Sequence, residues 1–297
     1  MTEGSPKDST YRARTNSLSI RRYAGAHGLT LVADVGGDAG APTVIFLHGG
    51  GQTRHSWAGS MRELIAQGYR VLNLDARGHG DSDWAADGDY TSKALTADLA
   101  CVIDTLDSRP ALVGASMGAA TALLFAGSAS SNAAALILVD LVPRFDPNGA
   151  ARIRAFMSAN PQGFASVDEA AAAVNAYNPH RPASRDAAGL MKNLRERDGR
   201  LYWHWDPRVL SNEGSEHVSF GEKLNQAARR VRVPTLLVRG LRSELVTEAG
   251  IEDLKTHLEH LEVFDVAEAG HMVVGDKNEV FNSGILYFLR RHLPTAR

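Results

Sequence analysis

A serine between two glycines is the most reactive pattern in the sequence. Residues 114–118 read GASMG, with Ser116 at the centre, and they directly follow the apolar run 111–113. This is the G-x-S-x-G pattern, in which a serine occupies a sharp turn between a strand and a helix. Glycines suit the flanking positions because they lack the Cβ atoms that would collide where strand and helix approach closely. The pattern predicts a serine nucleophile at a helix N-terminus, where the helix dipole favours developing negative charge.

A serine hydroxyl is a weak nucleophile and needs a base, usually a histidine that a carboxylate orients. His271 is the candidate base because it follows Gly270 in the loop after the last expected strand. Two acids compete for the third role. Glu244 lies 27 positions before His271 (271 − 244 = 27), and Asp140 lies 24 positions after Ser116 (140 − 116 = 24). We prefer Glu244 and keep Asp140 as the alternative acid, whose other role would be to hydrogen-bond loop backbone.

The tetrahedral intermediate of acyl transfer carries an oxyanion, which needs hydrogen-bond donors already in place. One expected donor is the backbone N–H of Met117, the residue after the nucleophile. We assign the other to Gly50, within the run His48-Gly49-Gly50-Gly51. A plain flexible turn is the alternative interpretation of these glycines. A phosphate-binding loop is rejected because no Gly-Lys-Ser/Thr follows them.

These residues lie at the ends of a regular series of apolar segments. The first two expected strands pair as an antiparallel hairpin, and the later ones alternate with helices, which predicts a parallel sheet with helices on both faces. Right-handed crossovers then bring the carboxyl ends of the strands, and the loops with chemistry on them, to one edge. The expected strands are 19–22, 29–35, 43–47, 69–74, 111–113, 134–139, 233–240 and 261–266.

The alternation is interrupted in the second half of the chain, which divides the molecule. We expect a loose tail over residues 1–18, a first part of the core over 19–142 and a second part over 232–297. Residues 143–231 are rich in Ala, Arg and Asn and contain several prolines, which predicts a mostly helical insertion.

Four separated motifs together resemble those of the α/β-hydrolase fold. They are His48-Gly49-Gly50, Asp75-x-Arg77-Gly78-x-Gly80-x-Ser82, the G-x-S-x-G around Ser116, and Gly270-His271. The resemblance covers nearly everything from about residue 20 to the end. It implies a mostly parallel eight-stranded sheet with helices on both faces, and it makes the insertion at 143–231 a cap over the active site.

The resemblance also carries two informative departures. Relatives that open epoxides or displace halides use aspartate as the nucleophile, so Ser116 argues against those activities. The family's usual acid at the position of Glu244 is aspartate, so the glutamate is a change of residue type at that position.

Composition narrows the functional classes. With 44% hydrophobic and 22% charged residues, the composition is ordinary for a soluble globular protein. The length of 297 residues suits one large α/β domain with room for an inserted subdomain. The formal charge of −2 gives no excess of positive charge that would indicate binding to nucleic acid or to an anionic membrane. The single cysteine, Cys101, has no internal partner, and no apolar run approaches the roughly 20 residues of a membrane helix. We therefore expect a cytoplasmic protein.

Other side chains are candidates for binding. We assign substrate contacts to residues near the glycine run and to two aromatics of the insertion: His48, Gly49, Gly51, His55, Trp203 and Trp205. The alternative for His48 is that it holds the shape of the loop. The alternative for the aromatics is that they pack the cap onto the core. Arginines of the insertion, Arg152 and Arg154 among them, could clamp a substrate carboxylate or form a solvated helix face. No histidine pair stands with a carboxylate at metal-ligand spacing, so we expect neither a metal nor a cofactor.

The leading functional hypothesis is a serine hydrolase that cleaves a small, partly apolar carboxylic ester or lactone through an acyl-enzyme. Two alternatives use the same residues: a cofactor-free haloperoxidase or perhydrolase, and a carbon–carbon bond hydrolase. A ligand receptor with low turnover is the alternative of another class, and the complete set of triad residues argues against it. We expect a small-molecule substrate as the partner, no nucleic acid or membrane, and leave open a homodimer.

Overall fold

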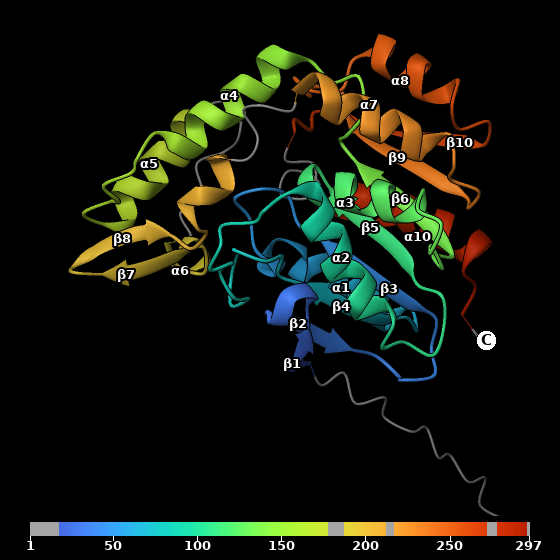
Figure 1. Cartoon of the computed structure of the whole chain (residues 1–297), viewed down its shortest axis with the longest axis horizontal. Coiled ribbons are helices and arrows are strands. Elements are labelled where there is room, and N and C mark those ends of the chain that lie inside the picture. Colours follow the sequence, from blue (N-terminus) through green and yellow to red (C-terminus); the bar gives the residue numbers. More distant parts are fainter. Residues whose placement is uncertain (1–17, 178–186, 212–216, 272–277, 296–297) are drawn as a thin grey trace, which may run out of the picture.

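The computed structural model describes residues 18–177, 187–211, 217–271 and 278–295 (Figure 1). Within these residues one eight-stranded sheet forms the centre, in the order β1-β2-β4-β3-β5-β6-β9-β10. Only the pairings of β2 with β1 and with β4 are antiparallel. The predicted mostly parallel eight-stranded sheet is confirmed. Its strands are β1 (Ser19–Ala24), β2 (Thr30–Gly36), β3 (Thr43–Leu47), β4 (Arg70–Leu74), β5 (Ala111–Ala115), β6 (Ala135–Val139), β9 (Thr235–Gly240) and β10 (Leu261–Val266).

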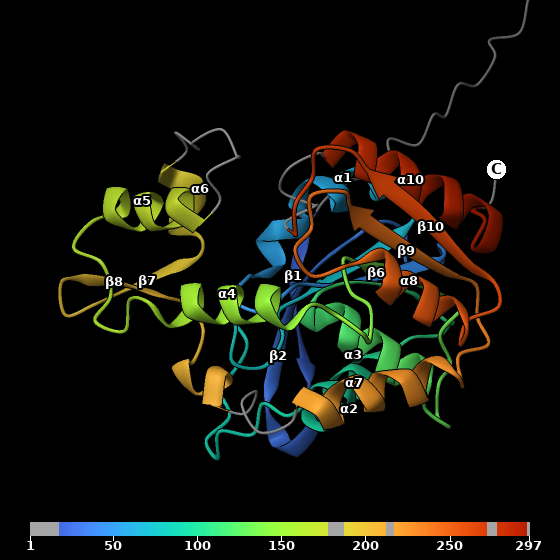
Figure 2. The ribbon, with the colours of Figure 1, turned by 90° about the horizontal axis from the view of Figure 1, so that it is seen from above.

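Helices cover both faces of the sheet because successive strand residues point to opposite sides (Figure 2). In β3, Val44 and Phe46 join the apolar cluster under α1 (Ala58–Ala66) and α10 (Asn278–His292). Ile45 and Leu47 face the other way and join the cluster beneath the remaining flanking helices. Those helices are α2 (Ser92–Ile103), α3 (Met117–Ala126), α7 (His217–Ala228) and α8 (Glu248–Lys255).

The insertion lies to one side of the sheet in both views (Figures 1 and 2). It consists of α4 (Pro147–Ser158), α5 (Val167–Tyr177), α6 (Ala187–Met191), β7 (Leu194–Arg197), β8 (Arg200–Trp203) and a 3-10 turn at Pro207–Ser211. The antiparallel β7–β8 hairpin was not predicted by the helical pattern.

Helix α7 falls inside the range predicted for the insertion, yet it packs against α3. Its residues Leu224 and Ala228 are fully buried in the same apolar cluster as α3. The apolar face of α7 thus adds to the cover of the sheet. The predicted tail at 1–18 falls outside the described residues except for Leu18.

The turn between β5 and α3 is built on contacts that only glycine allows. A Cβ on Gly118 would lie 2.3 Å from the carbonyl oxygen of Leu47, and one on Gly114 would lie 2.3 Å from the carbonyl oxygen of Gly118. Ser116 lies between them and adopts φ 48° and ψ −111°, a backbone conformation that residues other than glycine rarely adopt. Its N–H donates to the carbonyl of Val139 at 3.1 Å, which ties the turn to the end of β6.

This packing predicts that Gly118→Ala is severely destabilising. Overpacking typically costs about 1–3 kcal/mol, and here the added methyl meets rigid backbone, so the free energy of unfolding should fall by at least that amount. Gly59→Ala is the matched control, because Gly59 is exposed on α1 and a Cβ there meets nothing within 4 Å. Thermal denaturation should show a lower midpoint for Gly118→Ala and an unchanged or higher one for Gly59→Ala. Equal midpoints for the two variants would contradict this explanation of the turn.

Candidate active site

Three side chains that can perform acyl transfer come from the carboxyl ends of three strands. Ser116 follows β5, Asp140 follows β6, and His271 lies in the segment after β10. Ser116 and Asp140 both adopt positive φ, at 48° and 51°. Strain of this kind is stable only where the surroundings enforce it, and here both residues sit where a strand ends against its neighbour. Ser116 and His271 line the same cavity.

The partner of His271 is Asp140. The histidine Nδ1 lies 2.7 Å from Asp140 Oδ2, and the aspartate side chain is buried. The other carboxylate oxygen, Oδ1, accepts the backbone N–H of Gly240 at 3.3 Å. An Nδ1–H held by a carboxylate leaves the Nε2 atom of the ring available as a base.

Glu244, our preferred acid, lies elsewhere. Its carboxylate accepts a hydrogen bond from the Tyr177 hydroxyl at 3.4 Å and pairs with Arg152, both of them residues of the insertion. After β9 the chain turns back, with the N–H of Ser243 bonded to the carbonyl of Gly240 at 2.9 Å, so that Ser243 and not Glu244 reaches the sheet edge. The structure therefore brings the alternative acid, Asp140, to His271 and reverses our preference.

The two backbone groups expected to bind an oxyanion are neighbours. A Cβ on Gly50 would lie 4.0 Å from the Cβ of Met117, and both residues line the cavity together with Ser116. Met117 is the first residue of α3, so its N–H has no acceptor within the helix. The N–H of Gly49 is bonded to Gln52 Oε1 at 3.0 Å.

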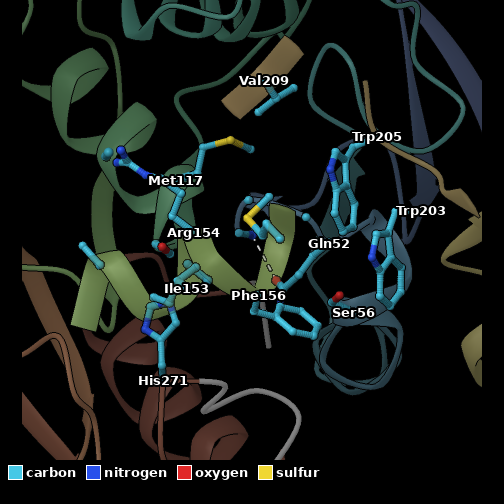
Figure 3. Close-up of a pocket in the computed structure, with 18 of the residues that line it drawn as sticks. Gln52, Ser56, Met117, Ile153, Arg154, Phe156, Trp203, Trp205, Val209 and His271 are labelled. Carbon is cyan, nitrogen blue, oxygen red and sulfur yellow. Dashed lines mark hydrogen bonds between the residues drawn. The ribbon is translucent and has the colours of Figure 1, made fainter. Parts of the chain in front are cut away.

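The N–H of Gly51, on the other side of Gly50, already has an acceptor as well, because it donates to His79 Nε2 at 3.3 Å. Within the described part of the chain, the N–H of Gly50 lying between them has no acceptor. Gln52, which the sequence did not single out, lines the cavity and holds the loop from inside (Figure 3).

The cavity has a volume of about 490 Å³ and lies between the sheet edge and the insertion. Figure 3 shows His271 on one side and Trp203 and Trp205 across from it. The two indoles are stacked with ring centroids 5.2 Å apart, and Phe156 and Tyr177 form a second stack at 4.4 Å. All four aromatics line the cavity. Such a surface favours an apolar substrate.

Not all expected substrate contacts reach this cavity. Gly49, Gly51, Trp203 and Trp205 line it, whereas the side chains of His48 and His55 do not. His48 is buried below the glycine run, where its Nε2 accepts the N–H of Ala76 at 3.0 Å and its Nδ1 therefore donates to the carbonyl of Gly49 at 2.8 Å. It holds the shape of the loop, which was the alternative interpretation.

Three buried histidines stand in a row behind that loop. The ring centroids of His48 and His79 are 5.1 Å apart, and those of His79 and His204 are 6.1 Å apart. Burial lowers the pKa of all three histidines. For His79 and His204 a neighbouring imidazole lowers it further, so that the pKa of His79 is about 3 and that of His204 about 2. The rings are therefore neutral near pH 7. His204 Nδ1 accepts the N–H of Gly80 at 2.7 Å, which links the insertion to the core.

The sequence and the fold both have counterparts among known proteins. A family model for the alpha/beta hydrolase fold matches residues 42–278. The chain belongs to this family. The esterase Rv0045c of Mycobacterium tuberculosis is 29% identical over 287 residues, which are 92% of this chain and 86% of the esterase. The sn-1-specific diacylglycerol lipase ABHD11 of Mus musculus is 30% identical over 272 residues, 85% of this chain and 82% of the lipase.

Solved α/β-hydrolase structures superpose over nearly the whole chain. The crystal structure of E-2-(acetamidomethylene)succinate hydrolase matches with a TM-score of 0.81 at 25% identity and covers 92% of this chain and 99% of that one. The structure of the M. tuberculosis esterase matches with a TM-score of 0.74 at 28% identity and covers 92% of both chains. With its relatives named esterase, lipase and hydrolase, this chain is an α/β-hydrolase enzyme.

Among the described residues, no helix combines the length and the apolar character of a membrane span. No cluster of three or more His, Cys, Asp or Glu side chains among them is arranged to hold a metal ion.

The histidine row predicts that stability decreases in mild acid. The folded-state pKa of His79 and His204 lies below the unfolded value of about 6.5, so between about pH 6.5 and pH 3 the unfolded chain binds more protons. The contribution of each of these histidines to the unfolding free energy is fully present above about pH 6.5. Below that pH it is lost by roughly 1.4 kcal/mol per pH unit.

His204→Asn removes one titrating ring but keeps an acceptor for Gly80. Urea unfolding at pH 7, 6 and 5 should show a smaller loss of unfolding free energy on acidification for this variant than for the unaltered protein. The exposed His260→Asn is the control and should leave the loss unchanged. An identical pH dependence in all three proteins would show that His204 is not held neutral by folding.

Proposed function

We propose that this α/β-hydrolase cleaves a carboxylic ester or lactone through a Ser116–His271–Asp140 triad and an acyl-enzyme. The observation that carries the proposal is the hydrogen bond between His271 and Asp140 at the cavity that also exposes Ser116. Relatives named esterase and lipase, similar over most of their length, support the same reaction class.

The chemistry follows from the positions of the donors and acceptors. His271 Nε2 removes the proton of Ser116 as its Oγ attacks the substrate carbonyl carbon, and Asp140 stabilises the resulting imidazolium through Nδ1. The backbone N–H groups of Gly50 and Met117 donate to the oxyanion. When the intermediate collapses, His271 gives the proton to the departing alkoxide and an alcohol leaves. Water then attacks the acyl group with the same proton transfers, and a carboxylic acid and free Ser116 result.

The size and lining of the cavity support a small, partly apolar substrate. A volume of about 490 Å³ with two aromatic stacks in its wall suits an acyl or alcohol group that is itself apolar or planar.

A second candidate function is carbon–carbon bond hydrolysis of a keto acid by the same residues. The 2-hydroxy-6-oxononadienedioate/2-hydroxy-6-oxononatrienedioate hydrolase of Paraburkholderia xenovorans is 27% identical over 268 residues, 84% of this chain and 87% of that enzyme. Arg154 lines the cavity and offers a guanidinium for a substrate carboxylate. Comparing kcat/KM for a dienoic keto acid with that for uncharged p-nitrophenyl esters separates the two functions, because the second predicts a clear preference for the keto acid.

Three substitutions test the leading proposal. With p-nitrophenyl butyrate, Ser116→Ala should abolish turnover, and Asp140→Asn should lower kcat by about 10³–10⁴ because the wrong tautomer of His271 is stabilised. Glu244→Gln should lower kcat by less than about tenfold, since Glu244 bonds to the insertion and not to His271. Circular dichroism establishes that each variant is folded. A severe loss in Glu244→Gln together with a mild one in Asp140→Asn would restore Glu244 as the triad acid.

A further inference from the structure

Ser243 makes a contact that the sequence did not reveal. Its Oγ lies 2.5 Å from Asp140 Oδ2, 3.1 Å from the N–H nitrogen of Leu245 and 3.3 Å from that of Val246. A hydroxyl has one proton and two lone pairs. Because the two N–H groups occupy the lone pairs, the hydroxyl proton is directed to Asp140.

The oxygen that receives this proton is the one that faces His271. Asp140 Oδ2 accepts from both Ser243 and His271, while Oδ1 accepts from Gly240. The last residue of β9 and the loop after it therefore supply a donor to each carboxylate oxygen. Asp140 adopts a positive φ and lies at a strand end, so these donors fix the direction in which its carboxylate points.

The next residue fastens the same loop to the insertion. Glu244 pairs with Arg152 of α4 and accepts from Tyr177 of α5. Burial, together with the Glu244 carboxylate, raises the pKa of Tyr177, which keeps the phenol protonated as a donor. Tyr177 also stacks on Phe156 in the cavity wall.

The backbone of the loop is held by the insertion as well. The N–H of Asp146 donates to the carbonyl of Leu245 at 3.0 Å. Gly149 of α4 lies so close that a Cβ on it would stand 2.3 Å from the carbonyl oxygen of Glu244. Residues 243–246 are thus in contact with the catalytic carboxylate on one side and with the aromatic wall on the other.

We propose that Ser243 is a positioning residue for Asp140 and that Glu244 transmits the position of the insertion to it. The inference rests on the proposed function, because it concerns the same triad. Ser243 aligns Asp140 for His271. Glu244 fixes the position of the loop that carries Ser243 relative to the cavity wall formed by Phe156 and Tyr177. Neither Ser243 nor Glu244 lines the cavity, so both act through the residues that they hold.

The first experiment compares Ser243→Ala, Ser243→Thr and Thr247→Ala on p-nitrophenyl butyrate. Ser243→Ala should lower kcat about 10- to 100-fold with little change in KM, because alignment for chemistry is lost while the cavity is kept. Ser243→Thr retains the hydroxyl and should restore most of kcat. Thr247 caps α8 close to the same loop by accepting the N–H of Gly250, without touching Asp140, so Thr247→Ala controls for loop stability and should keep kcat.

A spectroscopic measurement distinguishes positioning from general loosening. The low-field proton resonance of the His271 Nδ1–H should shift in Ser243→Ala and stay in place in Thr247→Ala, because only Ser243 shares the acceptor oxygen with that proton. An unchanged resonance and unchanged kcat in Ser243→Ala would overturn the role of Ser243.

The link to the insertion is tested by combining Ser243→Ala with Glu244→Ala. With Ser243 present, Glu244→Ala should lower kcat by about three- to tenfold, and with Ala at 243 it should have no further effect, because its influence passes through the hydroxyl. If the fold-losses in kcat of the two single variants multiply in the double variant, or if Glu244→Ala alone leaves kcat unchanged, Glu244 does not act through Ser243. Ser116→Ala is measured in parallel: turnover that persists without Ser116 refutes the proposed function, whereas Ser116-dependent turnover that ignores Ser243 refutes only this inference.

Discussion

The close approach of backbone to backbone where β5 turns into α3 is the constraint on which the rest of the site depends. Gly114 and Gly118 let the turn pack against β3, and that packing holds Ser116 at a positive φ. The N–H of Ser116 is bonded to Val139, whose next residue, Asp140, has a positive φ of its own. Ser116 and Asp140 are therefore strained by the same strand ends, and the order of the sheet fixes their spacing.

The remaining parts of the site are neutral or apolar supports for these few polar atoms. Below the glycine run, His48 and His79 are kept uncharged by burial and bond to loop backbone on both sides. Above it, the insertion closes the cavity with stacked aromatic rings. Charge that develops on the substrate oxygen during acyl transfer would meet fixed dipoles instead of mobile water, which is where preorganised donors are most effective.

The parts of this structure that the sequence predicted are those set by local pattern. Short apolar runs identified the strands, and the spacing of glycines around Ser116 identified the turn. The choice between Asp140 and Glu244 could not be made in this way, because both residues follow neighbouring strands whose carboxyl ends lie at the same edge of the sheet. It depends on the turn from Gly240 to Ser243 and on the contact of Gly149 with the Glu244 backbone, which joins residues far apart in the chain.

The same limit explains the other differences. The β7–β8 hairpin and the packing of α7 on α3 depend on tertiary contacts that a helical composition does not reveal. His48 was weighed both as a substrate contact and as a loop support, and only its two hydrogen bonds to backbone distinguish them. Ser243 had no sequence signal apart from its place beside an acid after a strand.

The proposed function requires that Ser116 is a nucleophile activated by His271 and Asp140. Its most direct test is mass spectrometric mapping of the residue that a fluorophosphonate probe modifies, with the labelling rate followed in the unaltered protein, Asp140→Asn and Glu244→Gln. We expect one label per chain, on the peptide that contains Ser116. It should form far more slowly in Asp140→Asn and at a nearly unchanged rate in Glu244→Gln. Labelling at another residue, or at Ser116 with equal rates in all three proteins, would contradict it.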